Sequence, residues 1–192
     1  MSGGMRPAVV EQLGERIRAA RQELDLSVGA LADLSEVSRR MLTQIELGQA
    51  NPSVALLDRI AAGLGTTFAA LMGVGAGDAP EGVEIWSTPG GSWAVLLDAM
   101  DTETVAVETW KWKLVGEDVY EGGASLPVLG IMHHVIDGAL EVETAESVQV
   151  VEAGGSGRAG PGGAYRYRAH DGQAAVFVSV AMLTRTAGPA AP

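Results

Sequence analysis

The hydrophobic pattern of the chain changes its period once, and this change limits the folds that the chain can adopt. Up to Met72, apolar residues recur every three or four positions, which is the period of an amphipathic helix. From Val83 onward they alternate with polar residues, as in half-buried strands. The segment between them is rich in Gly and contains a Pro. We therefore predict an all-α domain, a linker, an all-β domain and a disordered tail, over residues 1–72, 73–82, 83–185 and 186–192.

Five short helices are predicted in the all-α domain. The first spans Val9 to Leu24, Ser27 caps the second, and Thr66 caps the last. In the stretch Ser27–Gly48, two helical patterns flank a tight polar turn. This is the helix-turn-helix arrangement, whose second helix enters the DNA major groove.

The exposed face of that second helix carries side chains suited to reading base edges. Arg39, Arg40, Thr43 and Gln44 fall opposite its apolar positions. Arginine can form paired hydrogen bonds with guanine, and glutamine with adenine. The alternative for the two arginines is a solvated helix face without a partner.

The run from Leu13 to Met72 resembles the Xre-type, lambda-repressor-like helix-turn-helix domain of phage repressors and bacterial regulators. The most specific part runs from Ser38 through Glu46 and Gly48 to Asn51-Pro52-Ser53. The resemblance implies an ion pair between Arg21 and Glu46, and a left-handed turn residue at Glu36 where the family usually has glycine. It also implies DNA contacts from Ser38, Arg39, Arg40, Met41, Thr43, Gln44 and Asn51.

The net charge of −11 is unevenly distributed. Residues 1–75 hold seven Lys and Arg against eight Asp and Glu, whereas residues 76–192 hold six against sixteen. Double-stranded DNA therefore stays a reasonable partner for the first part, with phosphate contacts from a local arginine cluster. The chain lacks cysteine, a secretory signal and any long apolar run, so we expect a cytoplasmic protein without membrane contact.

Eight short strands separated by Gly, Pro or Asp are predicted beyond the linker. Asp137-Gly138 is typical of a hairpin turn, and the glycine-rich run Ala153–Tyr165 suggests a flexible loop. About eight strands without intervening helices indicate a closed sandwich or barrel.

Three stretches, His133–Val142, Val148–Gly155 and Pro161–Val180, resemble the conserved parts of a small cupin, a β jelly roll. Conventional cupins hold a divalent metal through histidines and a glutamate. Here Ile131 and Tyr165 stand at two of those positions, and the others fall on Ser125 and Pro127 or on Ala124 and Leu126. We therefore expect no metal and no cofactor, but a cavity for a small, partly apolar molecule.

Strand alternation predicts which side chains face this cavity. Ile131 and His133 should share one face, with His134 on the other. The alternative is that these side chains are only satisfied core residues. The candidate ligand-binding residues are Trp110, Trp112, Ile131, His133, Tyr165 and Tyr167.

Together these features predict a sequence-specific DNA-binding transcriptional regulator. We expect a homodimer on a palindromic operator, whose affinity a small-molecule effector changes. Two alternatives are a cupin metalloenzyme with a DNA-binding appendage and an antitoxin-type module that grips a protein partner.

Overall fold

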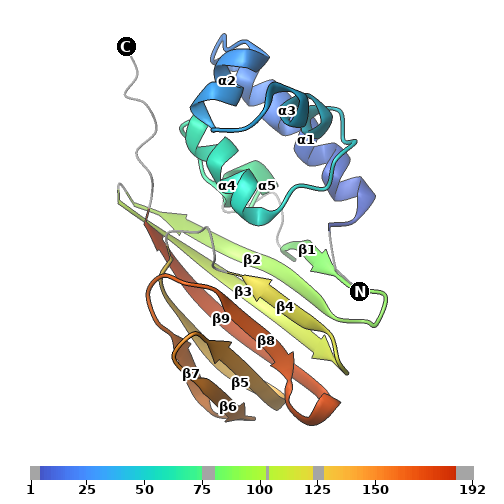
Figure 1. The fold of residues 1–192 in the computed structure, drawn as a ribbon, viewed down its shortest axis with the longest axis vertical. Coiled ribbons are helices and arrows are strands. Elements are labelled where there is room, and N and C mark those ends of the chain that lie inside the picture. The colour runs from blue at the N-terminus through green and yellow to red at the C-terminus, as the bar shows by residue number, and fades with distance from the viewer. Residues whose placement is uncertain (1–4, 75–80, 103, 123–127, 185–192) are drawn as a thin grey trace.

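The computed structural model describes residues 5–74, 81–102, 104–122 and 128–184 (Figure 1). The tail predicted over residues 186–192 and residues 75–80 of the predicted linker lie outside these ranges. Five helices form the first part of the described chain, as predicted. They are α1 (Pro7–Glu23), α2 (Val28–Leu34), α3 (Arg39–Glu46), α4 (Val54–Gly63) and α5 (Phe68–Met72).

Side-chain caps fix the starts of the short helices. The hydroxyls of Ser27, Ser38 and Ser53 accept hydrogen bonds from backbone N–H groups three residues later, at 3.1, 3.1 and 3.3 Å. Thr67, and not the predicted Thr66, caps α5. The Thr66 amide instead donates to the Ala61 carbonyl and closes the end of α4, so this residue belongs to the preceding turn.

Close contact between α1 and α3 depends on Gly14. A Cβ atom at this position would collide with the carbonyl oxygen of Ile45. The buried apolar side chains of the helices surround this crossing and form the core of the helical domain. They include Leu13, Ile17, Leu31, Leu42, Ile45, Leu57 and Ile60.

Nine antiparallel strands follow in the described residues, one more than predicted. They are β1 (Val83–Ser87), β2 (Trp93–Asp101), β3 (Val105–Val115), β4 (Val119–Gly122), β5 (Val128–Thr144), β6 (Val148–Glu152), β7 (Ser156–Ala159), β8 (Tyr165–Ala169) and β9 (Ala174–Thr184). The main order is β1-β2-β3-β9-β5-β8-β4, and β6 and β7 also pair with β5. β7 lies within the glycine-rich run that was predicted to be a loop. This part of the prediction is wrong, because all four residues of β7 pair with β5.

The prediction of a hairpin at Asp137-Gly138 is wrong, because β5 continues through these residues as one strand. Its first part pairs with β7 and β9, and its second part pairs with β6 and β8. Gly138 has a φ of 73°, and a Cβ on it would collide with the carbonyl oxygen of Ala174. Gly138 therefore bends one long strand from one part of the sheet to the other, instead of reversing the chain.

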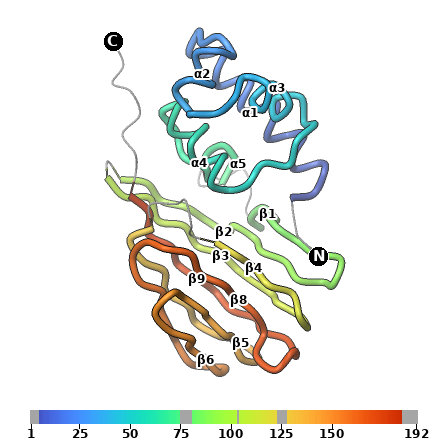
Figure 2. Tube along the Cα trace, in the orientation of Figure 1, coloured from blue at the N-terminus to red at the C-terminus, as the bar shows by residue number. Residues whose placement is uncertain are grey.

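The sheet curls into a half-barrel that resembles a cupin jelly roll. The helical domain lies over this sheet, with α4 and α5 as the helices nearest to it (Figures 1 and 2). Phe68 of α5 stacks on Trp110 of β3, with ring centroids 6.4 Å apart. Arg6 also pairs with Glu84 of β1, at an Nε–Oε1 distance of 3.0 Å. Within the described ranges, no helix is long and apolar enough to cross a membrane.

Candidate functional site

The outer face of α3 is the first candidate site. All but one of the predicted DNA-contact residues are exposed, and Gln44 is half-buried. Ser38 caps the helix, and the Thr43 hydroxyl donates to the Arg39 carbonyl at 2.9 Å. Asn51 lies in the connection between α3 and α4 and is exposed.

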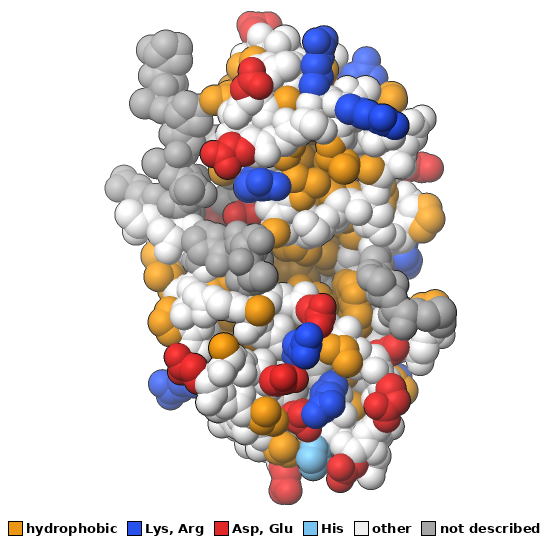
Figure 3. Space-filling view, viewed as in Figure 1, with side chains coloured by type: hydrophobic (Ala, Val, Ile, Leu, Met, Phe, Trp, Pro, Cys, Tyr) orange, Lys and Arg blue, Asp and Glu red, His pale blue; other side chains and the backbone are white. Residues whose placement is uncertain are grey.

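Arg39 and Arg40 are exposed and form no ion pair with any residue in the described ranges. Lys and Arg side chains lie on the part of the helical domain that is farthest from the sheet, over α2 and α3 (Figure 3). Two guanidinium groups without internal partners are available to phosphates and base edges.

A buried ion pair holds α3 against α1. Arg21 donates to both carboxylate oxygens of Glu46, at 2.6 and 2.9 Å, and to the Leu26 carbonyl at 2.8 Å. The two charged side chains are only 11% and 7% exposed. Glu36, in the turn before α3, has the left-handed conformation that the sequence predicted, with a φ of 52°. These contacts fix the direction in which α3 presents its outer face.

The concave side of the half-barrel is the second candidate site. Alternate residues of β3 point inward, so Glu108, Trp110 and Trp112 are buried together. Trp112 packs between Tyr120 and Tyr167, with ring centroids 4.6 and 5.6 Å away. The indole N–H of Trp112 donates to Ser179 at 2.9 Å.

A cavity of about 30 Å³, measured as the space that the centre of a water molecule can occupy, lies among these side chains. Five of the six predicted ligand-binding residues line it: Trp110, Trp112, Ile131, Tyr165 and Tyr167. His133 does not line it, although it points to the same side of the sheet. Val54 of α4 contributes to the wall, so the cavity lies against the helical domain.

Glu108 also lines the cavity and was not among the predicted site residues. Burial, opposed by the hydrogen bond from Trp110 and helped by Asp58 and Asp101, raises the pKa of its carboxyl from 4.5 to about 7. The Trp110 indole N–H donates to Glu108 Oε2 at 3.0 Å. Its position in phase with Trp110 and Trp112 on β3 was the sequence signal that could have identified it.

His133 lies behind the cavity, edge-on to Tyr167 and Phe177, at centroid distances of 5.1 and 6.3 Å. It is 2% exposed, and His134 is exposed on the outer side, as strand alternation predicts. Neither ring nitrogen of His133 has a hydrogen-bond partner among the described residues. Burial lowers the pKa of its imidazole to about 4, so the ring is neutral near pH 7.

Three tyrosines complete the aromatic wall. Burial raises the pKa of Tyr120 to about 12, and it raises the pKa values of Tyr165 and Tyr167 further. All three hydroxyls are therefore neutral at physiological pH. The Tyr167 hydroxyl is buried and interacts with the Tyr165 hydroxyl, but it forms no well-aligned hydrogen bond within the described residues.

Metal ligands are scarce in this part of the fold. Ile131 and Tyr165, which stand at two of the cupin ligand positions, face the cavity but offer no carboxylate or imidazole. Across the described ranges, no group of three or more His, Cys, Asp or Glu side chains could hold a metal ion. The other positions, Ala124 to Pro127, lie outside the described residues.

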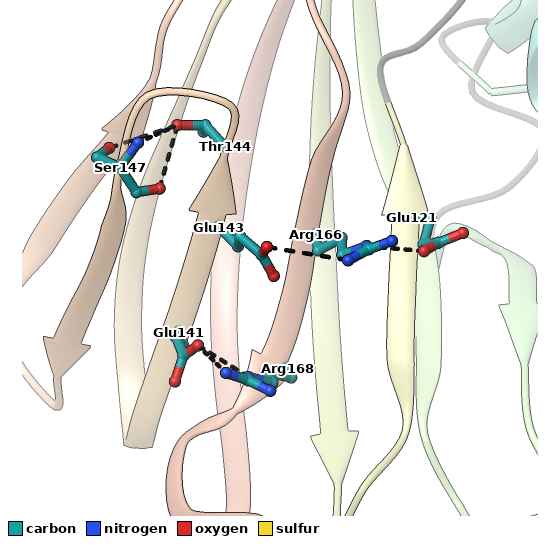
Figure 4. A network of polar contacts seen from close by, with 7 residues as sticks. All are labelled: Glu121, Glu141, Glu143, Thr144, Ser147, Arg166 and Arg168. Carbon is teal, nitrogen blue, oxygen red and sulfur yellow. Dashed lines mark hydrogen bonds and ion pairs between the residues drawn. The ribbon is translucent and has the colours of Figure 1, made fainter.

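Charged residues on the outer side of the half-barrel form a separate network (Figure 4). Arg166 of β8 lies between Glu121 of β4 and Glu143 of β5, with N–O distances of 2.8 and 3.8 Å. Arg168 pairs with Glu141, which lowers the pKa of that carboxyl. This network connects three strands from outside and does not reach the cavity.

Fold and sites together define a two-domain protein: an N-terminal helix-turn-helix domain followed by a half-barrel that resembles a cupin jelly roll. Residues 17–71 match the family described as HTH_3, Helix-turn-helix. The match covers the helical domain alone, which is therefore similar to the helix-turn-helix domains of this family.

Three known proteins are similar to parts or most of the chain. The immunity repressor protein of Bacillus phage phi105 is 38% identical over 61 residues, which span 32% of this chain and 42% of the repressor. The crystal structure of an HTH_3 family transcriptional regulator from Vibrio cholerae has a TM-score of 0.65 and 26% identity, and covers 91% of this chain and 97% of that one. The Cupin_2 domain of an XRE family transcriptional regulator from Enterobacter cloacae covers 39% of this chain and 79% of that one, at 17% identity, and its TM-score of 0.35 is too low to define the fold.

Proposed function

We propose that the protein is a sequence-specific DNA-binding transcriptional regulator and not an enzyme. The observation that carries this proposal is the exposed face of α3, where Arg39 and Arg40 have no internal partner in the described chain. The Vibrio cholerae regulator, which is similar over almost its whole length, supports the same function. The phage repressor supports it for the helical domain alone.

The helical domain would place α3 in the major groove. Arg39 and Arg40 begin this helix, and the early residues of a recognition helix are those that reach base edges. The Arg21–Glu46 pair holds the last turn of α3 to α1 and keeps this direction fixed. Because the helical domain is nearly neutral, we expect weak non-specific binding and a strong dependence on base contacts.

A small-molecule effector would act through the cavity of the half-barrel. Its wall combines residues of β3, β5 and β8 with Val54, the first residue of α4. Phe68 stacks over the same wall from α5. A ligand that needs more space than the empty cavity provides would displace α4 and α5, and would thereby change how the DNA-reading helix is held.

A homodimer would form through the outer face of β9 and β5. The residues of β9 that point outward are Val176, Val178, Val180 and Met182, although strand surfaces facing water are usually polar. Met132 of β5 pairs with Val180, and Met132 is 50% exposed. A second copy covering this apolar face would bring two α3 helices onto one palindromic site.

Selection from a random duplex DNA library tests the proposed function. We expect the purified chain to enrich a palindrome with half-sites about 10 base pairs apart, because two recognition helices of a dimer lie one DNA turn apart. A chain substituted at both Arg39 and Arg40 with Ala serves as the control. Equal recovery of all sequences by the native chain would contradict the proposal, and co-purification with a protein partner would favour an interaction module instead.

A further inference from the structure

We propose that the cavity of the half-barrel binds a small organic ammonium ion, with Glu108 as the counter-ion. This inference names the ligand class of the proposed effector site, and its regulatory meaning rests on the proposed function. The binding chemistry itself rests only on the walls of the cavity.

Aromatic rings make up much of the wall. Trp110, Trp112, Tyr120, Tyr165 and Tyr167 all line the cavity. The centroids of neighbouring rings are 4.6 to 6.3 Å apart, so the rings pack against each other. An ion in the cavity beside them would therefore lie close to several rings. The electron-rich faces of Trp and Tyr attract cations, and the attraction is stronger where water is excluded.

Glu108 adds a buried carboxyl that no cation of the described chain pairs with. It is 6% exposed, and no Lys or Arg of the described chain forms an ion pair with it. The two lysines of the same strand, Lys111 and Lys113, alternate to the opposite side. Buried carboxylates are normally paired, so this one indicates a cation that comes from outside the chain.

The Tyr167 hydroxyl provides a second polar contact. It is buried in the cavity wall, where it interacts with the Tyr165 hydroxyl but forms no well-aligned hydrogen bond within the described residues. Its oxygen can accept a hydrogen bond from an ammonium N–H. A cavity wall of aromatic rings, a hydroxyl acceptor and a carboxylate suits an ammonium group better than an anion or a sugar.

The size of the cavity limits the ion. About 30 Å³ for water centres is enough for one or two waters or a compact group such as methylammonium. A larger amine would need movement of Val54, which lines the cavity from the helical domain, or of Phe68, which stacks on the lining residue Trp110. Figure 3 shows a hollow lined by hydrophobic side chains between the helical domain and the sheet.

Cation binding should be coupled to release of a proton from Glu108. The titratable groups that act on its carboxyl are Asp58 on α4, Asp101 on β2, Tyr120 on β4 and Tyr165 on β8, and the Trp110 indole on β3 donates to it. Burial, more than the two aspartates, raises the pKa of this carboxyl to about 7 in the empty site, and a bound ammonium ion would favour the carboxylate. Since the carboxyl pKa is about 7, affinity should rise about tenfold between pH 6 and pH 8 and then level off.

Tryptophan fluorescence and calorimetry test the proposal on the full chain. Methylammonium chloride is titrated through the millimolar range, where so small a ligand is expected to bind, with potassium chloride at equal ionic strength as the blank. Methanol is the matched neutral probe. We expect a saturable response to methylammonium only, a tenfold gain from pH 6 to pH 8, and proton release measured in buffers of different ionisation enthalpy.

Two variants make the result decisive. Glu108→Gln keeps the shape of the side chain and the hydrogen bond from Trp110. It should weaken the affinity for methylammonium at least tenfold and remove the pH dependence of binding. Glu121→Gln, an exposed carboxylate on the outer side, should leave binding unchanged. Equal binding of methanol, or an unchanged affinity in a folded Glu108→Gln variant, would overturn the proposal.

Operator binding separates this inference from the proposed function. A chain that selects an operator but ignores methylammonium would overturn the ammonium site and leave the regulator intact. A chain that binds methylammonium but no DNA would leave the site intact and overturn the regulator.

Discussion

Replacing Glu108 with Gln should stabilise the β domain at high pH and have little effect at low pH. Burial raises the carboxyl pKa from 4.5 to about 7 in the folded chain. Below pH 4.5 the carboxyl is protonated in both folded and unfolded chains and carries no penalty. As pH rises from 4.5 to 7, the unfolded chain loses the proton first, so the native protein loses about 3 kcal/mol of stability. Gln stays neutral at every pH and avoids this loss.

Urea unfolding followed by tryptophan fluorescence measures the effect, because all four tryptophans lie in the β domain. The free energy of unfolding of the variant minus that of the native chain should be near zero at pH 4 and about 3 kcal/mol at pH 8. His133, whose lowered pKa destabilises the native chain as pH falls from 6.5 to about 4, is present in both chains and cancels in the difference. A difference that stays constant from pH 4 to pH 8 would refute the account of Glu108.

Three further predictions concern the fold and the assembly. Gly138→Ala should lower the free energy of unfolding by about 3 kcal/mol or more, because the new Cβ would collide with the Ala174 carbonyl and because the residue has a φ of 73°. Urea unfolding at pH 7 measures this change, and an unchanged unfolding midpoint would contradict the role of Gly138 in the bend. Arg21→Met should cost about 3 kcal/mol, since it leaves the buried Glu46 carboxylate unpaired; the double variant Arg21→Met, Glu46→Leu should recover much of that loss in the same assay. Val180→Asp should convert the proposed dimer to a monomer in analytical ultracentrifugation, and an unchanged sedimentation coefficient would point to another interface.

Much of the helical domain could be predicted from the sequence because its signals are local. Ser27 and Ser53 are caps that act within three residues, and Leu13 and Ile17 repeat at helical spacing. Thr66 was assigned to the wrong helix, because the turn that ends α4 and the cap that begins α5 are adjacent. Sequence alone does not show which of two neighbouring hydroxyls the chain uses.

The β domain was harder to predict because strand pairing is a long-range property. Asp137-Gly138 has the composition of a hairpin turn, but the partners of β5 are β6 to β9, which follow it in the chain. The sequence of β7 predicts a loop because glycine and serine have low strand propensity, but pairing with β5 decides its conformation. Strand alternation predicts the inward faces, and it also places Glu108 on the same face as Trp110.

The binding of a selected operator by arginine variants tests the central claim most directly. Fluorescence anisotropy gives the operator affinity of the native chain, of Arg39→Ala and of Arg40→Ala. Arg59→Ala is the control, because Arg59 is an exposed arginine on α4. Each α3 substitution should weaken specific binding by about 1–3 kcal/mol for each lost base contact, and Arg59→Ala should have little effect. Equal operator affinity of the native chain and both α3 variants would show that α3 does not read DNA.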